Sequence, residues 1–128
     1  MAGVAIAPVP ATFAVRAPIE QLAQSIAALV RNGLEASDAG APVEVRMSTR
    51  GGQVEIAVID RGPGIGPDTL ARIGEPFFTT KQPGRGLGLG VFLARAFFES
   101  QGGTLQLRSV PGTGTEAIAT LPVALGAA

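Results

Sequence analysis

The chain has 128 residues, of which 46% are hydrophobic and 16% charged, and ten basic residues balance ten acidic ones. This composition predicts one globular domain with a buried core, and the zero net charge argues against a general nucleic-acid or membrane-binding surface. Cysteine and histidine are both absent, which excludes disulfides, thiolate or imidazole metal sites and histidine-dependent nucleophiles within this chain.

The first predicted elements are a lead-in, a strand and a helix. Residues 1–12 are small and apolar, are interrupted by prolines and carry no charged leader, so we expect a flexible lead-in rather than a signal peptide. Residues 13–16 are a short strand candidate. Pro18 stands where a helix can begin, and apolar residues then recur at helical spacing, which predicts an amphipathic helix over 19–37.

The rest of the chain reads as two strand pairs that flank two helices. Gly51-Gly52 separates two apolar-patterned runs and predicts a hairpin. The order predicts an α/β two-layer sandwich, with a mixed sheet covered on one face by helices. The remaining predicted ranges are strands 43–47, 54–59, 104–109 and 115–121, helices 67–73 and 87–100, a mobile loop over 74–86 and a tail over 123–128.

A glycine-rich segment precedes the last predicted helix. Glycines alternate from Gly84 to Gly90 and an apolar run follows at once. Close backbone approach and the unpaired N–H groups of a helix start favour a bound anion, most often phosphate. The pattern matches neither a P-loop nor a dinucleotide-binding fingerprint. A flexible glycine-rich loop is the alternative interpretation.

Asp60 ends a buried strand and opens the loop Asp60-Arg-Gly-Pro-Gly-Ile-Gly66. A carboxylate only accepts hydrogen bonds, so it can receive the amino group of adenine, whereas it would repel the carbonyl oxygen of guanine. Gly62 and Gly64 leave room for a flat base. The alternative is an Asp-Gly turn in which Asp60 caps its own loop.

Four further positions are candidates for phosphate, metal or base contacts. The amide oxygen of Asn32 is a suitable Mg²⁺ ligand beside phosphates, and Glu35 lies one turn further on. Lys81 and Arg85 can meet phosphate oxygens if loop 74–86 closes as a lid. Solvent exposure is the alternative for each of them. The hydroxyl of Thr115 can point into a base pocket, or the residue can simply belong to a hairpin.

Five motifs in order resemble a known family. They are Asn32, Asp60-x-Gly62-x-Gly64, Phe77-Phe78-Thr79-Thr80-Lys81, Gly86-x-Gly88-x-Gly90 and Gly112-x-Gly114-Thr115. They are similar to the N, G1, F, G2 and G3 boxes of the GHKL ATP-binding superfamily, and more narrowly of the catalytic domain of sensor histidine kinases. The resemblance covers roughly 13–122. It implies a Bergerat fold that binds ATP and Mg²⁺ under a short lid.

By matching positions, the resemblance implies a role for each motif residue. Asn32 would hold Mg²⁺ and act in catalysis together with Lys81, and Asp60 would bind adenine. The full set of nucleotide-binding residues that it implies is Asn32, Glu35, Asp60, Gly62, Gly64, Ile65, Phe78, Thr79, Thr80, Lys81, Arg85, Gly86, Leu87, Gly88, Leu89 and Thr115.

Two departures shape the expected activity. Family members that hydrolyse ATP carry a glutamate general base one turn before the asparagine, where this chain has Ala28. The chain also lacks any histidine, so the phosphoacceptor would lie on a separate dimerisation domain, normally upstream in the same protein. We therefore expect an excised catalytic domain, with a naturally split protein as the alternative. In either case the domain would donate phosphate to the acceptor histidine and act indirectly on a response regulator.

The resemblance further implies a cytoplasmic domain, monomeric in isolation, whose parent protein can be membrane-anchored. It implies no nucleic-acid partner and no membrane contact by this domain. Two alternative functions remain at this point. One is a serine kinase of the anti-sigma-factor type, which shares the motifs, and the other is a non-catalytic nucleotide-binding module.

Overall fold

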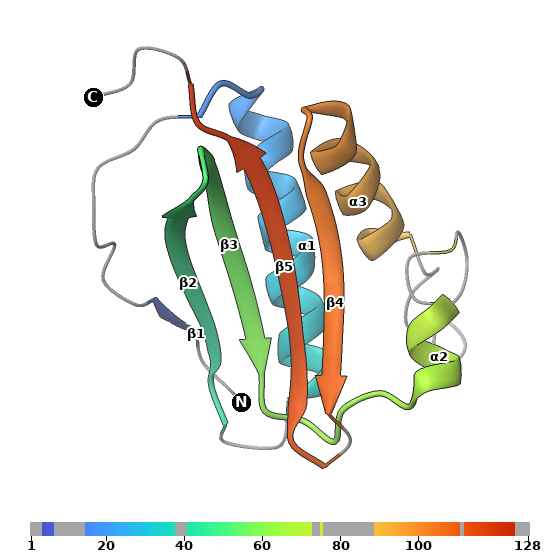
Figure 1. Ribbon diagram of the computed structural model, residues 1–128. Coiled ribbons are helices and arrows are strands. Elements are labelled where there is room, and N and C mark those ends of the chain that lie inside the picture. The colour runs from blue at the N-terminus through green and yellow to red at the C-terminus, as the bar shows by residue number, and fades with distance from the viewer. Residues whose placement is uncertain are drawn as a thin grey trace.

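The computed structural model describes residues 4–6, 15–37, 41–72, 75, 89–110 and 112–124. Among these residues, five strands form one mixed sheet in the order β1-β2-β3-β5-β4, and α1 and α3 cover the same face of it (Figure 1). The predicted two-layer α/β architecture is confirmed. The elements are β1 (Val4–Ile6), α1 (Ile19–Ala36), β2 (Val43–Arg50), β3 (Gln53–Asp60), α2 (Pro67–Arg72), α3 (Gly90–Ser100), β4 (Thr104–Val110) and β5 (Gly114–Pro122).

The first strand is not where the sequence placed it. Val4–Ile6 pairs in parallel with Val43–Val45 of β2, inside the stretch expected to be a flexible lead-in. All three of its side chains are exposed, so backbone pairing rather than an apolar pattern holds it there. Within the predicted strand 13–16, Val15 makes an isolated antiparallel bridge with Val123, and residues 13–14 lie outside the described residues.

The helix α1 crosses the sheet with one apolar stripe turned toward it. Leu29 and Gly33 are buried on this stripe, while Glu20 lies exposed in the first turn. A buried stripe with an exposed opposite face is expected for a helix with 3.6 residues per turn that covers one face of a sheet. The helix ends at Ala36, and Ser37 caps it through a backbone N–H that donates to the carbonyl oxygen of Gly33 over 2.9 Å.

Two antiparallel hairpins supply most of the sheet. β2 and β3 pair from Glu44–Ile59 to Arg50–Gln53, across the Gly51-Gly52 turn, where both glycines have positive φ. β4 and β5 form the second hairpin, and β5 lies between β3 and β4. Asp60 of β3 thereby stands opposite Thr115 of β5. This register brings two of the predicted site residues together.

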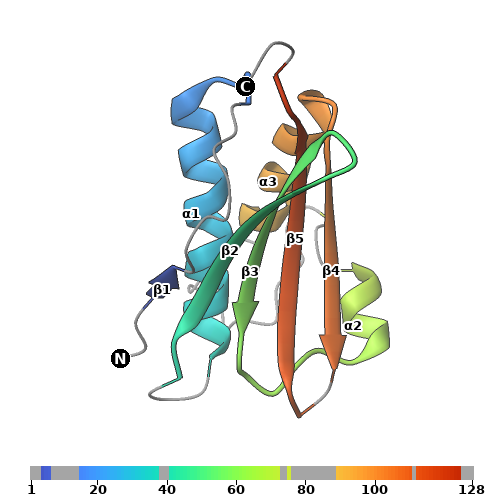
Figure 2. The same cartoon turned by 60° about the vertical axis from the view of Figure 1, so that its left-hand side comes forward.

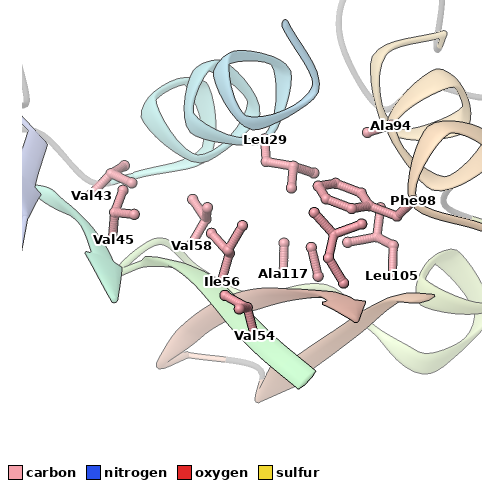
Figure 3. Packing of buried hydrophobic residues seen from close by; sticks show 12 residues of the cluster. Leu29, Val43, Val45, Val54, Ile56, Val58, Ala94, Phe98, Leu105 and Ala117 are labelled. Atoms are coloured by element: carbon pink, nitrogen blue, oxygen red, sulfur yellow. The ribbon is translucent and has the colours of Figure 1, made fainter. Parts of the chain in front are cut away.

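The core lies between the sheet and the two long helices (Figure 3). Phe98 of α3 is fully buried and Leu29 of α1 is 2% exposed, and both belong to one core cluster with apolar side chains from every strand of the two hairpins. Figure 2 shows α1 and α3 on the same side of the sheet when the molecule is turned. Burial of this surface is the main stabilising force, and it fixes where the ends of α1 and β3 meet.

The third helix begins later than predicted. It starts at Gly90, with Leu89 as its N-cap, whereas the apolar pattern predicted a start at Leu87. Residues 87 and 88 lie outside the described residues, as does all of the predicted mobile loop 74–86 except Glu75. None of the helices in the described ranges is long and apolar enough to cross a membrane.

Candidate functional site

Asp60 is the centre of the candidate site. It is 6% exposed at the end of β3, and its Oδ1 accepts hydrogen bonds from the backbone N–H groups of Gly62, at 3.0 Å, and Thr115, at 3.2 Å. The Asp-Gly turn considered above therefore exists. It is compatible with ligand binding, because a carboxylate has about four acceptor positions on its two oxygens.

The loop after Asp60 packs closely against the C-terminal end of α1. A Cβ atom at Gly62 would overlap the carbonyl oxygen of Ala36, so only glycine fits at this position. Gly64 has a φ of 78°, which also favours glycine. The two glycines that the sequence assigned to the base pocket thus have structural reasons as well, which are the close contact with α1 for Gly62 and the positive φ for Gly64.

The turn between β4 and β5 closes the other side of the loop. A Cβ atom at Gly114 would overlap the carbonyl oxygen of Asp60, and Gly112 donates its N–H to the carbonyl oxygen of Pro63 over 2.6 Å. The turn is a hairpin, as its sequence suggested, and it also contacts the Asp60 loop through Gly112 and Gly114. These contacts join β3, β5 and the loop into one packed unit around the carboxylate.

Ser109 of β4 joins the same unit, although the sequence analysis did not select it. Its Oγ accepts a hydrogen bond from the N–H of Ile65 at 2.6 Å and lies 3.1 Å from Oγ1 of Thr115. The same hydroxyl lies 3.2 Å from the carbonyl oxygen of Gly114, to which it can donate. The available signal was the register of the hairpin, which places Ser109 opposite Thr115. Ser109 itself belongs to none of the five sequence motifs.

Thr115 acts through its backbone as well as its side chain. It is 7% exposed, its N–H donates to Asp60, and its hydroxyl is within hydrogen-bond distance of Ser109. The sequence analysis gave two interpretations of Thr115, a hydroxyl directed into a base pocket or a residue that simply belongs to a hairpin. The structure adds a second role, in which Thr115 fixes the orientation of the Asp60 carboxylate.

The helix α1 brings Asn32 to the same region. Gly33 faces the sheet so closely that a Cβ there would lie 3.2 Å from Cγ2 of Val43 and 3.7 Å from Cβ of Asp60. Asn32 is the next residue around the helix and is half-buried, while Glu35 is exposed one turn further on. Asn32 is therefore adjacent in the chain to the residue of α1 that packs against Asp60 at the end of β3.

Asn32 fits Mg²⁺ as a single protein ligand. Its amide oxygen is of the hard type that Mg²⁺ prefers, and no group of three or more potential metal-ligating acids is found in the described part of the chain.

Half of the predicted nucleotide-binding set lies within the described residues. Among the described members, Asn32, Asp60, Gly62, Gly64, Ile65 and Thr115 gather around the end of β3, and Leu89 caps α3. The predicted members that lie outside the described residues are Phe78, Thr79, Thr80, Lys81, Arg85, Gly86, Leu87 and Gly88.

Comparison with known proteins gives a consistent result. The family model described as histidine kinase-, DNA gyrase B-, and HSP90-like ATPase matches residues 17–125. The histidine protein kinase DivJ of Caulobacter vibrioides is 38% identical over 119 residues, which cover 91% of this chain and 20% of DivJ. The sensor protein kinase FleS of Pseudomonas aeruginosa is 43% identical over 104 residues, which cover 81% of this chain and 25% of FleS.

Solved structures agree with these relatives. Full-length ShkA in complex with AMPPNP superposes with a TM-score of 0.85 at 30% identity, covering 98% of this chain and 26% of ShkA. The catalytic domain of histidine kinase ThkA superposes with a TM-score of 0.81 at 25% identity, covering 94% of this chain and 78% of that domain. DivJ, FleS and ThkA are named as histidine or sensor kinases, and these names give no support to a serine kinase of the anti-sigma-factor type.

Proposed function

Because this chain belongs to the family of histidine kinase-, DNA gyrase B-, and HSP90-like ATPases, we propose that it donates the γ-phosphate of ATP to a histidine on a separate dimerisation domain. It is an ATP-binding catalytic domain of the histidine kinase type. The chain spans only about a quarter or less of DivJ and FleS. Transfer by the whole protein, its acceptor domain and a response regulator downstream are therefore parts of the proposal.

The observation that carries the proposal is the fixed carboxylate of Asp60. Two backbone N–H groups hold one of its oxygens at the end of β3, beside two glycines that keep the loop narrow. A carboxylate held in this way presents acceptors and no donor, so it selects the amino group of adenine over the carbonyl oxygen of guanine. Desolvation inside the fold strengthens this preference, since a mismatched base would leave a buried acceptor unpaired.

The phosphates and Mg²⁺ would lie along α1, next to the base. Asn32 supplies an oxygen ligand to the metal, and Glu35 on the following turn supports that region. Lys81 and Arg85 provide positive charge for the phosphates, and the backbone N–H groups of Gly86, Gly88 and the start of α3 bind phosphate oxygens. Bound Mg²⁺ would neutralise charge on the phosphates.

The transfer step needs no nucleophile from this chain. A neutral imidazole nitrogen of the acceptor uses its lone pair to form a bond with the γ-phosphorus. The bond from that phosphorus to the bridging oxygen breaks, and its electron pair leaves with ADP. The imidazole loses its other ring proton to solvent. The contribution of this chain is to position the nucleotide and stabilise the charge on the phosphates.

Water is a poor substitute for the acceptor in this site. Ala28 lies one turn before Asn32, where a side chain could reach a water molecule beside the γ-phosphate, and its methyl group cannot remove a proton. We therefore propose negligible ATP hydrolysis by the chain alone. We also propose a cytoplasmic location, where ATP is present, with a parent protein that can be anchored in a membrane.

Calorimetry tests the first part of the proposal, which is that Asp60 binds the adenine base of ATP. Wild type binds Mg-ATP more tightly than Mg-GTP, and Asp60→Asn loses at least about tenfold in ATP affinity, because the amide replaces an acceptor with a donor and removes the charge. Asp68→Asn, an exposed acid in the first turn of α2, is the matched control and leaves affinity unchanged. Undiminished ATP binding by Asp60→Asn would disprove the base assignment.

A transfer assay tests the second part of the proposal, which is that the γ-phosphate is passed to a histidine on a separate domain. The chain is incubated with radiolabelled Mg-ATP and a purified histidine-bearing dimerisation domain from a relative such as DivJ, and acid-labile phosphate on that domain is measured. We expect transfer to the acceptor and no release of free phosphate in its absence. Normal ATP binding without transfer to any acceptor would support a non-catalytic nucleotide-binding module instead.

A further inference from the structure

A row of three polar side chains lies across one end of the sheet. Asp60 of β3 is paired with Thr115 of β5, which is paired in turn with Ser109 of β4. These three strands are neighbours in the sheet (Figure 1), so the three side chains project from the same face. The next row on that face belongs to the core or packs against it, and it consists of Val58, Ala117 and Leu107.

The three strands therefore change from apolar to polar at the same row. Asp60 and Thr115 are 6% and 7% exposed, and a buried polar side chain is costly unless its hydrogen-bonding groups have partners. Alanine or valine at the positions of Thr115 and Ser109 would continue the core without that cost. The row therefore indicates a ligand with polar groups along one edge, which under the proposed function is the adenine base.

The hydroxyl of Ser109 decides whether Thr115 offers a hydrogen-bond donor or only acceptors. Oγ of Ser109 already accepts from the N–H of Ile65 over 2.6 Å, and its own hydrogen can go to one of two acceptors. These are the carbonyl oxygen of Gly114 at 3.2 Å and Oγ1 of Thr115 at 3.1 Å. If Ser109 donates to Gly114, the Thr115 hydroxyl donates back to Ser109. If Ser109 donates to Thr115, the hydrogen of Thr115 is left for another partner.

The Watson–Crick edge of adenine distinguishes the two arrangements. This edge presents an amino donor next to the N1 acceptor, so a matching site needs an acceptor beside a donor. Asp60 supplies only acceptors, and Thr115 is its direct neighbour, since the Cβ atoms of such paired residues are about 4.5–5.5 Å apart. We infer that Ser109 is a positioning residue for adenine recognition, which donates to Thr115 so that Thr115 donates toward N1, an inference that rests on the proposed function.

The same arrangement is required if one water molecule lies between Thr115 and the base. The carboxylate of Asp60 and N1 would take both hydrogens of that water, so only a donor from Thr115 completes its hydrogen bonds. Guanine reverses the requirement, because its N1 carries a hydrogen. A Thr115 hydroxyl held as a donor therefore opposes guanine at a second position, in addition to the repulsion at Asp60.

An ATP analogue that lacks only the N1 acceptor tests the inference. In 1-deaza-ATP a C–H group replaces N1, while the amino group that would bind Asp60 remains. Calorimetry on the full chain gives the ratio of the Mg-1-deaza-ATP dissociation constant to that of Mg-ATP. We expect a ratio of about five or more for the wild type, because the analogue leaves the Thr115 donor unpaired. Thr115→Val keeps the backbone N–H that binds Asp60 and lowers the ratio to near one.

Two variants of similar size at position 109 separate positioning from a merely structural role. Ser109→Asn can accept from Ile65 and still donate to Thr115, so the ratio stays well above one. Ser109→Asp only accepts, so it takes the hydrogen of Thr115, and the ratio falls to one or below. The smaller variant Ser109→Ala leaves the Thr115 hydroxyl free to rotate among three staggered positions, and the ratio falls by up to about threefold.

The ratio distinguishes the possible outcomes. A merely structural Ser109 would change both affinities alike, so equal ratios for Ser109→Asn and Ser109→Asp would overturn the positioning role. A wild type that binds Mg-ATP with a ratio near one would overturn the inference about Ser109 and leave the proposed function intact. A wild type that does not bind Mg-ATP would refute the proposed function and the inference together.

Discussion

The backbone N–H of Thr115 donates to Oδ1 of Asp60 over 3.2 Å, and so ties the acid at the end of β3 to the start of β5. The Gly62 N–H donates to the same oxygen from the loop side. The carboxylate is consequently held by two separate parts of the backbone, one near and one far along the chain. The position of the carboxylate therefore depends on the β4–β5 hairpin as much as on its own loop.

Removal of the Ser109 hydroxyl should loosen the Asp60 loop. Ser109→Ala leaves the N–H of Ile65 without its acceptor and removes the contact with Thr115, at a cost of about 1–3 kcal/mol in the free energy of unfolding. ATP affinity falls modestly, because the loop is less well ordered before binding. Urea denaturation and calorimetry measure the two effects. Ser48→Ala, an exposed serine on β2, is the control and changes neither quantity.

A methyl group at position 62 should disturb the contact between the loop and α1. Gly62→Ala forces the loop away from the Ala36 carbonyl and lowers the free energy of unfolding by about 1–3 kcal/mol or more. Gly66→Ala is the matched control, because a Cβ there meets nothing within 4 Å, and its effect stays within about 0.5 kcal/mol. Equal stability of the two variants in urea would contradict the described packing.

Loss of the Asn32 amide should act through the metal. Asn32→Ala lowers affinity for ATP in the presence of Mg²⁺ by at least about tenfold, since even an outer-shell partner of a metal contributes that much. Affinity for ATP in EDTA changes little, because Asp60 and its loop remain. Calorimetry under both conditions separates the effects, and Glu20→Gln at the exposed start of α1 serves as control. An equal loss with and without Mg²⁺ would remove Asn32 from the metal site.

The core makes a prediction that is independent of any ligand. Phe98→Ala leaves a cavity between α3 and the sheet and lowers the free energy of unfolding by about 3–5 kcal/mol. Leu93→Ala on the same helix changes it by less than about 0.5 kcal/mol, because that side chain is largely exposed. Thermal and urea unfolding followed by circular dichroism distinguish the two. A comparable loss for both variants would contradict the burial of Phe98.

The long helices and both hairpins were predictable because each carries its own periodic signal. The stripe of α1 and the glycine turn at Gly51-Gly52 need no information from elsewhere in the chain. The strand Val4–Ile6 has no such signal, since its three exposed side chains carry no alternation and its partner Val43–Val45 is remote in sequence. The start of α3 was placed early because Leu87 fits the apolar pattern, although the helix itself begins at Gly90.

The candidate site likewise contains residues that sequence motifs indicate and one residue, Ser109, that no motif indicates. Asp60, Asn32 and the paired glycines belong to ordered motifs, so the family resemblance could select them although residue type alone left alternatives open for each. Ser109 has no motif, and its importance depends on a hydrogen bond to Ile65 across 44 positions of the chain. Such contacts follow from strand register, which is set only when the whole sheet assembles.

The proposed double use of Asp60, as a base acceptor and as an acceptor for two backbone N–H groups, would limit how this domain can change its nucleotide preference. A substitution that would make the pocket accept guanine also removes or alters the acceptor for the Gly62 and Thr115 amides. A lineage that altered specificity at this position would therefore need compensating changes in the β4–β5 hairpin and the loop at the same time. Under the proposed role of Asp60, a single substitution at this position would perturb the fold and the nucleotide preference together.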